Sequence, residues 1–449
     1  MALPDLIEIV PLTQPVRAEI TVPGSKSITN RALILAALAD GEVTLTGALW
    51  SEDTQIMVEC LEKLGFEIRV EQDPEEFCNR TITVKGLGGK IPKGGTAEKP
   101  LELFVGNAGT AARFLSAFVC LGNGVYRLSG IPRMNERPKA ALFQALRELG
   151  YRVESEKKNE KLPVVVHGKA EIEKAESGKR KAETKCTVDI SESSQFASAL
   201  LLCAKHGNWK IKVLGENEEE SPYVAMTTKL IEVFPSKGGK FQIEPDASSG
   251  SYFWSANTLL NWRFKDHVRI AVQNWPDSDW QMDARFRDYS LNAIKLLPGH
   301  VISRKVDLAD SVMTAIVMAP VEASAGNFAK TFVDLGRLRV QETERVVALR
   351  TELTRCGAKV EEQGDTLTVY PSPLHGAEIE TYNDHRMAMC FAILGLKVPG
   401  IKLKNPACVK KTFPNFFQKL ATPPPKGLGA TILDGKTGRK LAVEELFAD

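Results

Sequence analysis

The sequence contains no long hydrophobic run, so a chain that spans a membrane is not expected. The longest apolar stretches, residues 32–39 and 196–204, fall short of the roughly 18–20 residues that a spanning helix needs. The N-terminal stretch lacks a basic region followed by an apolar run. We therefore expect no signal peptide.

Neither sign of charge dominates. The 58 basic side chains nearly balance 56 acidic ones, which leaves a net charge of +2. Bulk electrostatic attraction to nucleic acid or to an anionic membrane is therefore not expected. A local basic pocket for a small anion remains compatible with this balance.

Metal-binding patterns are also missing. The eight cysteines and six histidines form no CxxC, HxxxH or HxH pattern, so we expect no metal site. Several cysteines lie inside apolar runs, among them Cys120, Cys203 and Cys390. This placement predicts buried thiols in a reducing cytoplasm.

The composition is typical of a globular chain, with 449 residues, 43% of them hydrophobic and 25% charged. A mainly disordered or fibrous protein is excluded. At roughly 100–200 residues per domain, this length predicts two to four domains.

One unit recurs along the chain, at residues 51–70, 135–154 and 341–362. In each copy an amphipathic helix is followed by a capping glycine and a strand with alternating apolar residues. The capping glycines are Gly65, Gly150 and Gly357. The copies predict two related halves built from repeated α/β units. The alternative is that helix, glycine and strand follow one another in any α/β protein.

Four other predicted helices are apolar on nearly every face, which requires that protein encloses them. Each begins with a polar cluster, at residues 26–27, 107–110, 193–195 and 384–386. Helix N-termini attract anions, because their backbone N–H groups and dipoles favour negative charge. If these N-termini converge, they predict an anion site.

Each polar motif also has an ordinary structural explanation. PGSKSITNR, with Lys26 and Arg31, could be a capped helix, and it is not a Walker A loop. Gly109 permits close approach of a ligand but also suits a tight turn. Arg133 and Arg137 suit binding of phosphate or carboxylate, or they are surface arginines. The cluster at 193–195 could only cap a helix, and a lone His385 is by default structural.

Taken together, the motifs are specific. PGSKSITNRAL, GNAGTAARFL, PRMNERP, SSQF, DASSGSYF, DSVMT, RVQETER, TYNDHRMAM and KKTFP occur in one order along the chain. In that order and spacing the sequence closely resembles the 5-enolpyruvylshikimate-3-phosphate synthase family, up to about Leu420. The resemblance implies transfer of the enolpyruvyl group of phosphoenolpyruvate to the 5-hydroxyl of shikimate 3-phosphate, with release of phosphate.

The resemblance also implies the architecture. The expected fold is a two-domain inside-out α/β barrel, each domain a threefold repeat of α/β units with buried helices and outer sheets. We expect one half at residues 22–243 and the other at 1–21 and 244–420. Residues 421–449 open with a polyproline break and are expected to be a C-terminal extension. Neither metal nor organic cofactor is implied, and we expect a cytoplasmic monomer.

Residue roles follow by matching motifs. Those implied for shikimate 3-phosphate are Lys26, Ser27, Arg31, Ser193, Ser194, Gln195 and Tyr223. Lys26 would also reach phosphoenolpyruvate and take part in catalysis. Those implied around phosphoenolpyruvate are Gly109, Arg133, Arg345, Arg386 and Lys411, and Asn107 and His385 complete the binding set. Asp310 would take the proton of the 5-hydroxyl and Glu342 would protonate the methylene carbon. The structural alternative for either carboxylate is a charge partner at a helix end.

The chain departs from the family pattern at several positions. Glu220 stands where a serine is usual, and Phe114 where many members have proline. Arg337 and Gln341 replace an asparagine and a lysine of the shikimate 3-phosphate set. Arg337 could compensate for the missing lysine if the segment is helical and the two side chains share a face.

Two other functions stay open. One is a UDP-N-acetylglucosamine enolpyruvyl transferase. It is disfavoured because that relative keeps a reactive cysteine in a mobile loop, and the corresponding residues 132–138 contain no cysteine. The other is a homologue that binds the substrates with impaired turnover. Gly109 also implies sensitivity to glyphosate, which competes with phosphoenolpyruvate in this family.

Overall fold

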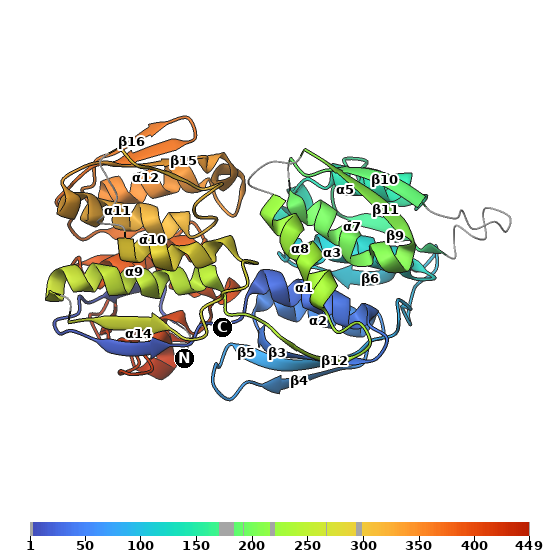
Figure 1. Cartoon of the computed structure of the whole chain (residues 1–449), viewed down its shortest axis with the longest axis horizontal. Helices are drawn as coiled ribbons and strands as arrows, with labels where there is room; N and C mark the ends of the chain where they lie inside the picture. Colours follow the sequence, from blue (N-terminus) through green and yellow to red (C-terminus); the bar gives the residue numbers. More distant parts are fainter. Residues whose placement is uncertain are drawn as a thin grey trace. The chain divides into compact units, whose positions relative to one another are not determined.

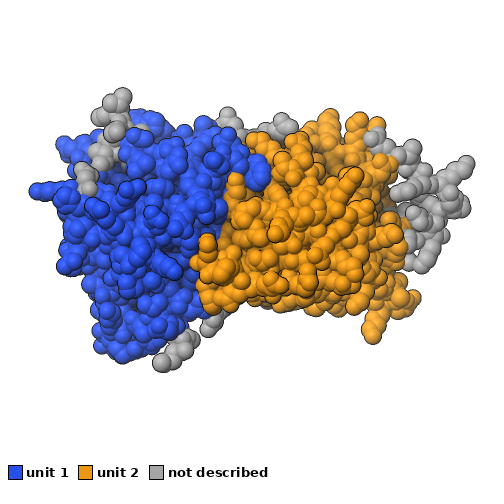
Figure 2. Space-filling model, turned by 60° about the horizontal axis from the view of Figure 1, so that its bottom comes forward, with its two compact units in different colours: residues 1–23, 245–449 blue, residues 24–244 orange. Residues whose placement is uncertain are grey.

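The computed structural model describes residues 3–169, 184–191, 193–215, 221–265, 267–292 and 299–448. The chain divides into two compact units (Figures 1 and 2). Unit 1 comprises residues 1–23 and 245–449, and unit 2 comprises residues 24–244. Within the described ranges, no helix combines the length and the apolar character that crossing a bilayer requires.

The described residues of unit 2 form two four-stranded sheets and one two-stranded sheet. The first sheet has the order β12-β3-β5-β4, formed by Gly239–Gln242, Glu42–Leu49, Asn79–Lys85 and Ile68–Gln72. The second has the order β6-β7-β9-β8, formed by Leu101–Phe104, Val125–Ser129, Val164–His167 and Val153–Ser155. The parallel pair is β10 (Thr184–Asp189) and β11 (Trp209–Leu214). Burial alternates along β11, as expected of a strand with one face toward the core.

The helices of unit 2 fall into two classes. The enclosed helices include α1 (Lys26–Leu38), α3 (Gly109–Phe118) and α7 (Ser194–Gly207), which are labelled in Figure 1. Every residue of α3 is buried. The expectation that these helices lie inside is therefore confirmed. Other helices among the described residues of this unit are α2 (Glu52–Lys63), η1 (Val119–Leu121), α4 (Pro132–Glu136), α5 (Ala140–Glu148) and α8 (Ser221–Val233).

In unit 1, the part of the chain that the structure describes also forms two four-stranded sheets and one two-stranded sheet. The sheet β18-β19-β1-β20 is formed by Glu378–Ile379, Ile401–Lys404, Leu6–Ile9 and Ile432–Asp434. The sheet β14-β15-β17-β16 is formed by Val301–Ser303, Lys330–Val333, Thr366–Val369 and Val360–Gln363. The two-stranded sheet pairs β13 (Arg269–Val272) with β2 (Arg17–Ile20).

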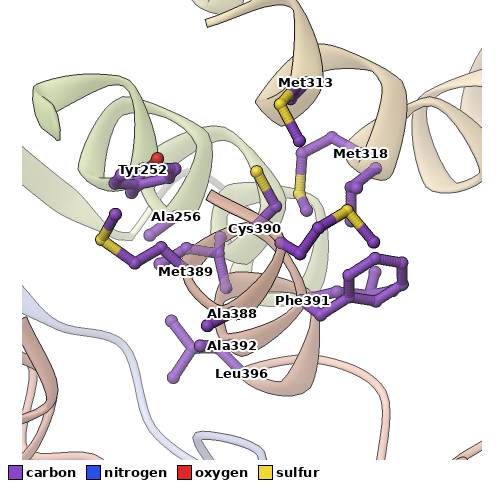
Figure 3. Close-up of a cluster of buried hydrophobic side chains, with 14 of the residues drawn as sticks. Tyr252, Ala256, Met313, Met318, Ala388, Met389, Cys390, Phe391, Ala392 and Leu396 are labelled. Carbon is purple, nitrogen blue, oxygen red and sulfur yellow. The ribbon is translucent and has the colours of Figure 1, made fainter. Parts of the chain in front are cut away.

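Helices α9 (Ala247–Phe264), α11 (Val312–Gly326) and α13 (His385–Gly395) contribute to the core of unit 1. Figure 3 shows Tyr252, Met313, Met318, Cys390 and Phe391 within this core. The other helices are α10 (Phe286–Asn292), α12 (Arg345–Arg355), α14 (Phe416–Ala421), η2 (Met282–Arg285), η3 (Leu335–Val340), η4 (Pro406–Lys411) and η5 (Val443–Leu446). All eight cysteines of the chain are among the described residues, buried and in no disulfide.

The same strand pattern recurs in all four of the four-stranded sheets. Each has one parallel pair followed by two antiparallel pairs. The three predicted units correspond to α2 with β4, α5 with β8, and α12 with β16. Their capping glycines have φ values of 95° at Gly65, 94° at Gly150 and 90° at Gly357. Such values favour glycine, so the predicted caps are confirmed.

The tail that the sequence analysis set apart, residues 421–449, belongs to unit 1. Strand β20 pairs antiparallel with β1, and its Ile432 aligns with Ile9. Leu441 and Leu446 are buried in the unit 1 core. The tail is therefore an integrated part of the unit 1 fold. The polyproline break precedes this packed segment and does not detach it.

Candidate active site

The N-terminus of α1 in unit 2 positions Lys26. A Cβ atom on Gly24 would lie 1.9 Å from the Gly47 carbonyl oxygen, so only glycine fits this turn. The ammonium of Lys26 lies 3.4 Å from the Oδ2 atom of Asp53. Asp53, on α2, is a charge partner that sequence reasoning missed. Ser27 is half-buried, and its carbonyl oxygen accepts a hydrogen bond from Arg31.

Arg31 is buried in a cage of hydroxyl groups. It donates hydrogen bonds to Thr227 Oγ1 at 2.8 Å and to Ser198 Oγ at 3.0 Å. Its guanidinium also lies 5.3 Å from the ring centroid of Phe114, the residue that departs from the family pattern. Burial lowers the pKa of Arg31 to about 10. These hydrogen bonds join α1 to α7 and α8.

The N-terminus of α3 places Gly109 beneath two guanidinium groups. A Cβ atom there would lie 2.8 Å from Nη1 of Arg137 and 2.9 Å from Nη1 of Arg113. Arg113 donates hydrogen bonds to the Gly109 carbonyl oxygen and to Gln195 Oε1, each at 3.0 Å. Gln195 thus joins α7 to α3. Arg113 was not among the predicted site residues, although it lies in the GNAGTAAR motif.

Arg133 and Arg137 occupy different positions in the structure. The side chain of Arg133 is 65% exposed and forms an ion pair of 2.9 Å with Glu136 on its own short helix. Arg137 is the one that approaches Gly109. The sequence analysis assigned the role of binding phosphoenolpyruvate to Arg133. Of the two arginines, Arg137 is the one whose guanidinium lies next to Gly109. Asn107 is half-buried just before α3.

The N-terminus of α7 carries the predicted Ser193, Ser194 and Gln195. Ser193 caps the helix, because its Oγ accepts a hydrogen bond from the Gln195 backbone N–H at 3.3 Å. Ser194 is buried. Tyr223, on α8, is half-buried, and its carbonyl oxygen accepts a bond from Thr227. Glu220, the predicted departure before Tyr223, lies outside the described residues.

In unit 1 Asp310 lies between two arginines. Nη2 of Arg386 is 2.9 Å from its Oδ2 atom, and Nη2 of Arg304 is 3.5 Å from its Oδ1 atom. Burial raises the pKa of Asp310, but the charges of Arg386, Arg304 and Arg345 outweigh it and hold the pKa well below its ordinary value. Arg386 also donates to Ser248 Oγ in the DASSGSYF motif. Asp310 is therefore a stabilised carboxylate.

Glu342, like Asp310, lies between two basic side chains. Its Oε1 atom lies 2.9 Å from the ammonium of Lys411, and its Oε2 atom lies 2.8 Å from Nη2 of Arg345. Arg345 is almost fully buried and pairs with Asp384 at 2.7 Å. The predicted residues Glu342, Arg345 and Lys411 are thus joined in one network. Asp384 is a further member that was predicted only as part of a helix start.

Gln341 and Arg337 do not share a helical face as the compensation hypothesis requires. Arg337 lies in η3, a 3₁₀-helix over Leu335–Val340, and Gln341 follows it as the C-cap. In a 3₁₀-helix residues three apart are aligned, so Arg337 is in register with Val340. Gln341 Oε1 instead accepts a hydrogen bond from Arg345. His385, the first residue of α13, is buried, and its Nδ1 atom lies 3.8 Å from the Oδ1 atom of Asp384.

Asp283 in η2 is a further buried carboxylate, and it holds the residue that follows Asp310. Its Oδ1 atom accepts a hydrogen bond of 2.8 Å from the backbone N–H of Ser311. Burial, and then the charge of Asp310, raise the pKa of Asp283. Gln281 in the same segment accepts a bond from the Ala247 N–H at 3.0 Å. This segment holds the starts of α9 and α11, and no sequence motif signalled it.

The two units therefore present different chemistry. Unit 2 offers hydroxyls, helix N-termini and several cations, which suit phosphate and carboxylate groups. Unit 1 offers two carboxylates, each paired with cations, which suit proton transfer beside an anion. Within the described residues, no three His, Cys, Asp or Glu side chains are placed to hold a metal ion.

Comparisons with known proteins identify relatives over most of the chain. The sequence profile of a family described as EPSP synthase (3-phosphoshikimate 1-carboxyvinyltransferase) matches residues 10–420. A 3-phosphoshikimate 1-carboxyvinyltransferase of Nostoc punctiforme is 38% identical over 443 residues, covering 92% of this chain and 98% of that protein. One of Opitutus terrae is 36% identical over 450 residues, covering 94% of this chain and 98% of that protein. The solved structure of EPSP synthase from Acinetobacter baumannii superposes with a TM-score of 0.72 at 20% identity, covering 95% of this chain and 99% of that one, which supports the fold.

Proposed function

The chain belongs to the EPSP synthase family, and we propose that it transfers the enolpyruvyl group of phosphoenolpyruvate to the 5-hydroxyl of shikimate 3-phosphate. The observation that carries the proposal is the pairing of Asp310 with Arg386 and of Glu342 with Lys411. Each pair joins a group able to move a proton to a cation able to hold the phosphate or the carboxylate of phosphoenolpyruvate.

Shikimate 3-phosphate is assigned to unit 2. Its phosphate and hydroxyls would contact Lys26, Ser27, Ser193, Ser194, Gln195 and Tyr223. Arg31 belongs to this set through its contacts with Ser27 and Thr227, which organise the surrounding helices. The neighbouring Gly109, Asn107, Arg133 and Arg137 would receive phosphoenolpyruvate. Helix N-termini and guanidinium groups stabilise phosphate without any metal.

The acid–base residues and the remaining cations belong to unit 1. Arg345, Arg386 and Lys411 would bind phosphoenolpyruvate, with Arg337, Gln341 and His385 near shikimate 3-phosphate. Asp310 takes the 5-hydroxyl proton while the oxygen attacks C2 of phosphoenolpyruvate, and Glu342, which must enter this step in its protonated form, gives its proton to the methylene carbon. In the second step the methyl group returns a proton to Glu342 and the C–O bond to phosphate breaks. The phosphate leaves with the proton that Asp310 held.

Asp310 is a weak base while Arg386 and Arg304 stabilise its charge. A bound phosphoenolpyruvate would take over part of the charge of Arg386 and Arg345. The pKa of Asp310 would then rise toward the value that general base catalysis needs. Substrate binding would in this way activate the base.

A phosphate-release assay tests the proposal. Phosphate should appear with phosphoenolpyruvate and shikimate 3-phosphate, and not with UDP-N-acetylglucosamine as acceptor. Release only with the nucleotide sugar would favour the other transferase. Thermal stabilisation by both substrates without phosphate release would favour the binding-only homologue.

We also propose a cytoplasmic monomer that acts on small molecules and binds neither nucleic acid nor membranes. The even charge balance and the eight buried cysteines support this. Sedimentation velocity at micromolar concentration, with and without added DNA, should give one species of about the mass of one chain, and fractionation of the source cells should place it in the cytosol.

A further inference from the structure

Lys139 is a fully buried lysine that none of the proposed roles uses. Its exposed fraction is 0%, and it is the N-cap of α5. Its Nζ atom donates to the carbonyl oxygens of Arg137 at 3.2 Å and of Met134 at 3.4 Å. Among the described residues no carboxylate forms an ion pair with it. Burying an ammonium group without a counter-charge costs free energy of folding, so we ask what this lysine contributes in return.

The charged groups that face Lys139 are all basic. They are Arg113 from α3, Arg137 from the end of α4, and Lys161 from the segment before β9. Glu136, the acidic residue of α4, instead pairs with the exposed Arg133. Burial, and then these three cations, lower the pKa of Lys139 to about 7. The lysine can therefore gain or lose its charge near neutral pH.

The same residues connect Lys139 to the proposed anion site. Its two carbonyl partners belong to the turn that carries Arg137. Arg137 and Arg113 in turn flank Gly109. Lys139, Arg137 and Arg113 repel one another, and an anion bound beside Gly109 would relieve this repulsion. A neutral amine would keep both carbonyl contacts, because it retains two N–H groups, while the extra charge would be lost.

We propose that Lys139 is a positioning residue for phosphoenolpyruvate: it fastens the turn that carries Arg137, and its proton adds a charge that strengthens anion binding. This inference rests on the proposed function and deepens it. Anion binding favours protonated Lys139, so binding should take up a proton near neutral pH. The contribution of Lys139 should be present below about pH 7 and should fade as the pH rises.

The test compares Lys139→Met with the wild type over pH 6 to 8.5. Methionine has a similar length and neither charge nor N–H donors. The ratio of the KM values for phosphoenolpyruvate, variant over wild type, should be about ten at pH 6 and should fall at pH 8.5. The kcat values should differ by less than about threefold. Because both proteins see the same substrate ionisation, the ratio isolates the lysine. The exposed Lys157→Met is the matched control and should give a ratio near one throughout.

Two further variants separate charge from packing. Lys139→Arg keeps its charge across the range, so its affinity should not weaken as the pH rises past 7. Lys139→Gln keeps a donor without charge and should behave like methionine at pH 6, and it replaces methionine if that variant does not fold.

A KM ratio that does not change with pH would overturn the proposal, as would a loss confined to kcat. Wild-type turnover with such a flat ratio rejects this inference alone and leaves the proposed function intact. If the wild type shows no turnover, the proposed function fails. The thermal shift produced by phosphoenolpyruvate, measured at pH 6 and 8.5, then still tests Lys139: a shift that weakens at pH 8.5 in the wild type and not in Lys139→Met supports it, and equal behaviour rejects it.

Discussion

Arg386 and Asp310 form an ion pair of 2.9 Å between Nη2 and Oδ2, so a cation proposed for phosphoenolpyruvate and the proposed base neutralise each other. The same arginine cannot fully stabilise both Asp310 and a substrate anion. Binding and basicity are therefore linked through one guanidinium group. A change at Asp310 should therefore alter the affinity for phosphoenolpyruvate, the turnover and the free energy of unfolding.

Asp310→Asn should bind phosphoenolpyruvate more tightly while losing catalysis. The amide leaves Arg386 available to the substrate and removes a negative charge that repels it, which should lower Kd by roughly threefold or more. Loss of the base should lower kcat by about a hundredfold or more. Calorimetry and phosphate release check the two effects. Weaker binding together with lost turnover would show that Asp310 mainly orders the pocket.

The pH dependence of stability follows from the same ion pair. The folded-state pKa of Asp310 lies below its unfolded value of about 3.9, so the pair stabilises the protein above that pH. This contribution is lost as the pH falls toward the folded-state pKa. The stability difference between wild type and Asp310→Asn should therefore shrink from pH 5 to pH 2.5 in urea unfolding. A difference that stays constant over this window contradicts the assigned pKa direction.

Asp384→Asn should destabilise unit 1 strongly. Arg345 is 1% exposed, and Asp384 holds its Nε at 2.7 Å and its Nη2 at 3.2 Å. The substitution leaves Glu342 as the one remaining described carboxylate beside the buried Arg345 charge, and weakening such a buried pair costs about 3 kcal/mol. Glu136→Gln is the control, because its pair with Arg133 is exposed and should contribute less than about 1 kcal/mol. Equal effects in denaturant unfolding would contradict this ranking.

The repeated units could be predicted from the sequence because their signals are local. A capping glycine after an amphipathic helix marks one position where a positive φ is needed, and Gly65, Gly150 and Gly357 all have it. The enclosed helices could also be predicted, because they are apolar on every face. The packing of residues 421–449 could not, because it depends on pairing β20 with β1, from opposite ends of the chain.

The candidate site could be predicted only in part, for the same reason. Motifs located Lys26, Arg345 and Asp310, but no motif pointed to their charge partners, two of which lie 27 and 39 residues away in sequence. Asp53, Asp384 and Arg304 join the site through folding, and spacing carries no signal for such contacts. The choice between Arg133 and Arg137 likewise depends on how the turn after α4 directs each side chain.

Gly109→Ala should weaken the binding of ligands that lie against α3 more than it lowers the stability of the fold. The new methyl group would meet the ends of Arg137 and Arg113, at 2.8 and 2.9 Å, and flexible side chains can move. Both guanidinium groups would then shift from their present positions. We expect a several-fold higher KM for phosphoenolpyruvate and a larger rise in the inhibition constant of glyphosate. Inhibition equal to that of the wild type would contradict the expectation.

Leu446→Ala should destabilise unit 1 if the tail is part of its core. Leu446 is 0% exposed, and truncating a buried leucine costs about 2–5 kcal/mol. Leu291→Ala is the control, because this leucine is 52% exposed and should cost less than about 1 kcal/mol. Urea unfolding measures both. A small effect at Leu446 would mean that the tail packs without contributing to stability.

The last prediction separates the roles of Gln341 and Arg337. Gln341 Oε1 accepts a hydrogen bond from Arg345, whose other described acceptors are Asp384 and Glu342. Gln341→Ala removes one of the acceptors that orient the Arg345 guanidinium, which should lower kcat/KM by about tenfold. Arg337 lies in a 3₁₀-helix in register with Val340, so Arg337→Ala should change kcat/KM by less than about threefold. Steady-state kinetics with both substrates gives the order of the two effects. If Arg337→Ala is the more damaging, Arg337 supplies the charge of the missing lysine despite its register, and the compensation hypothesis is restored on other grounds than a shared helical face.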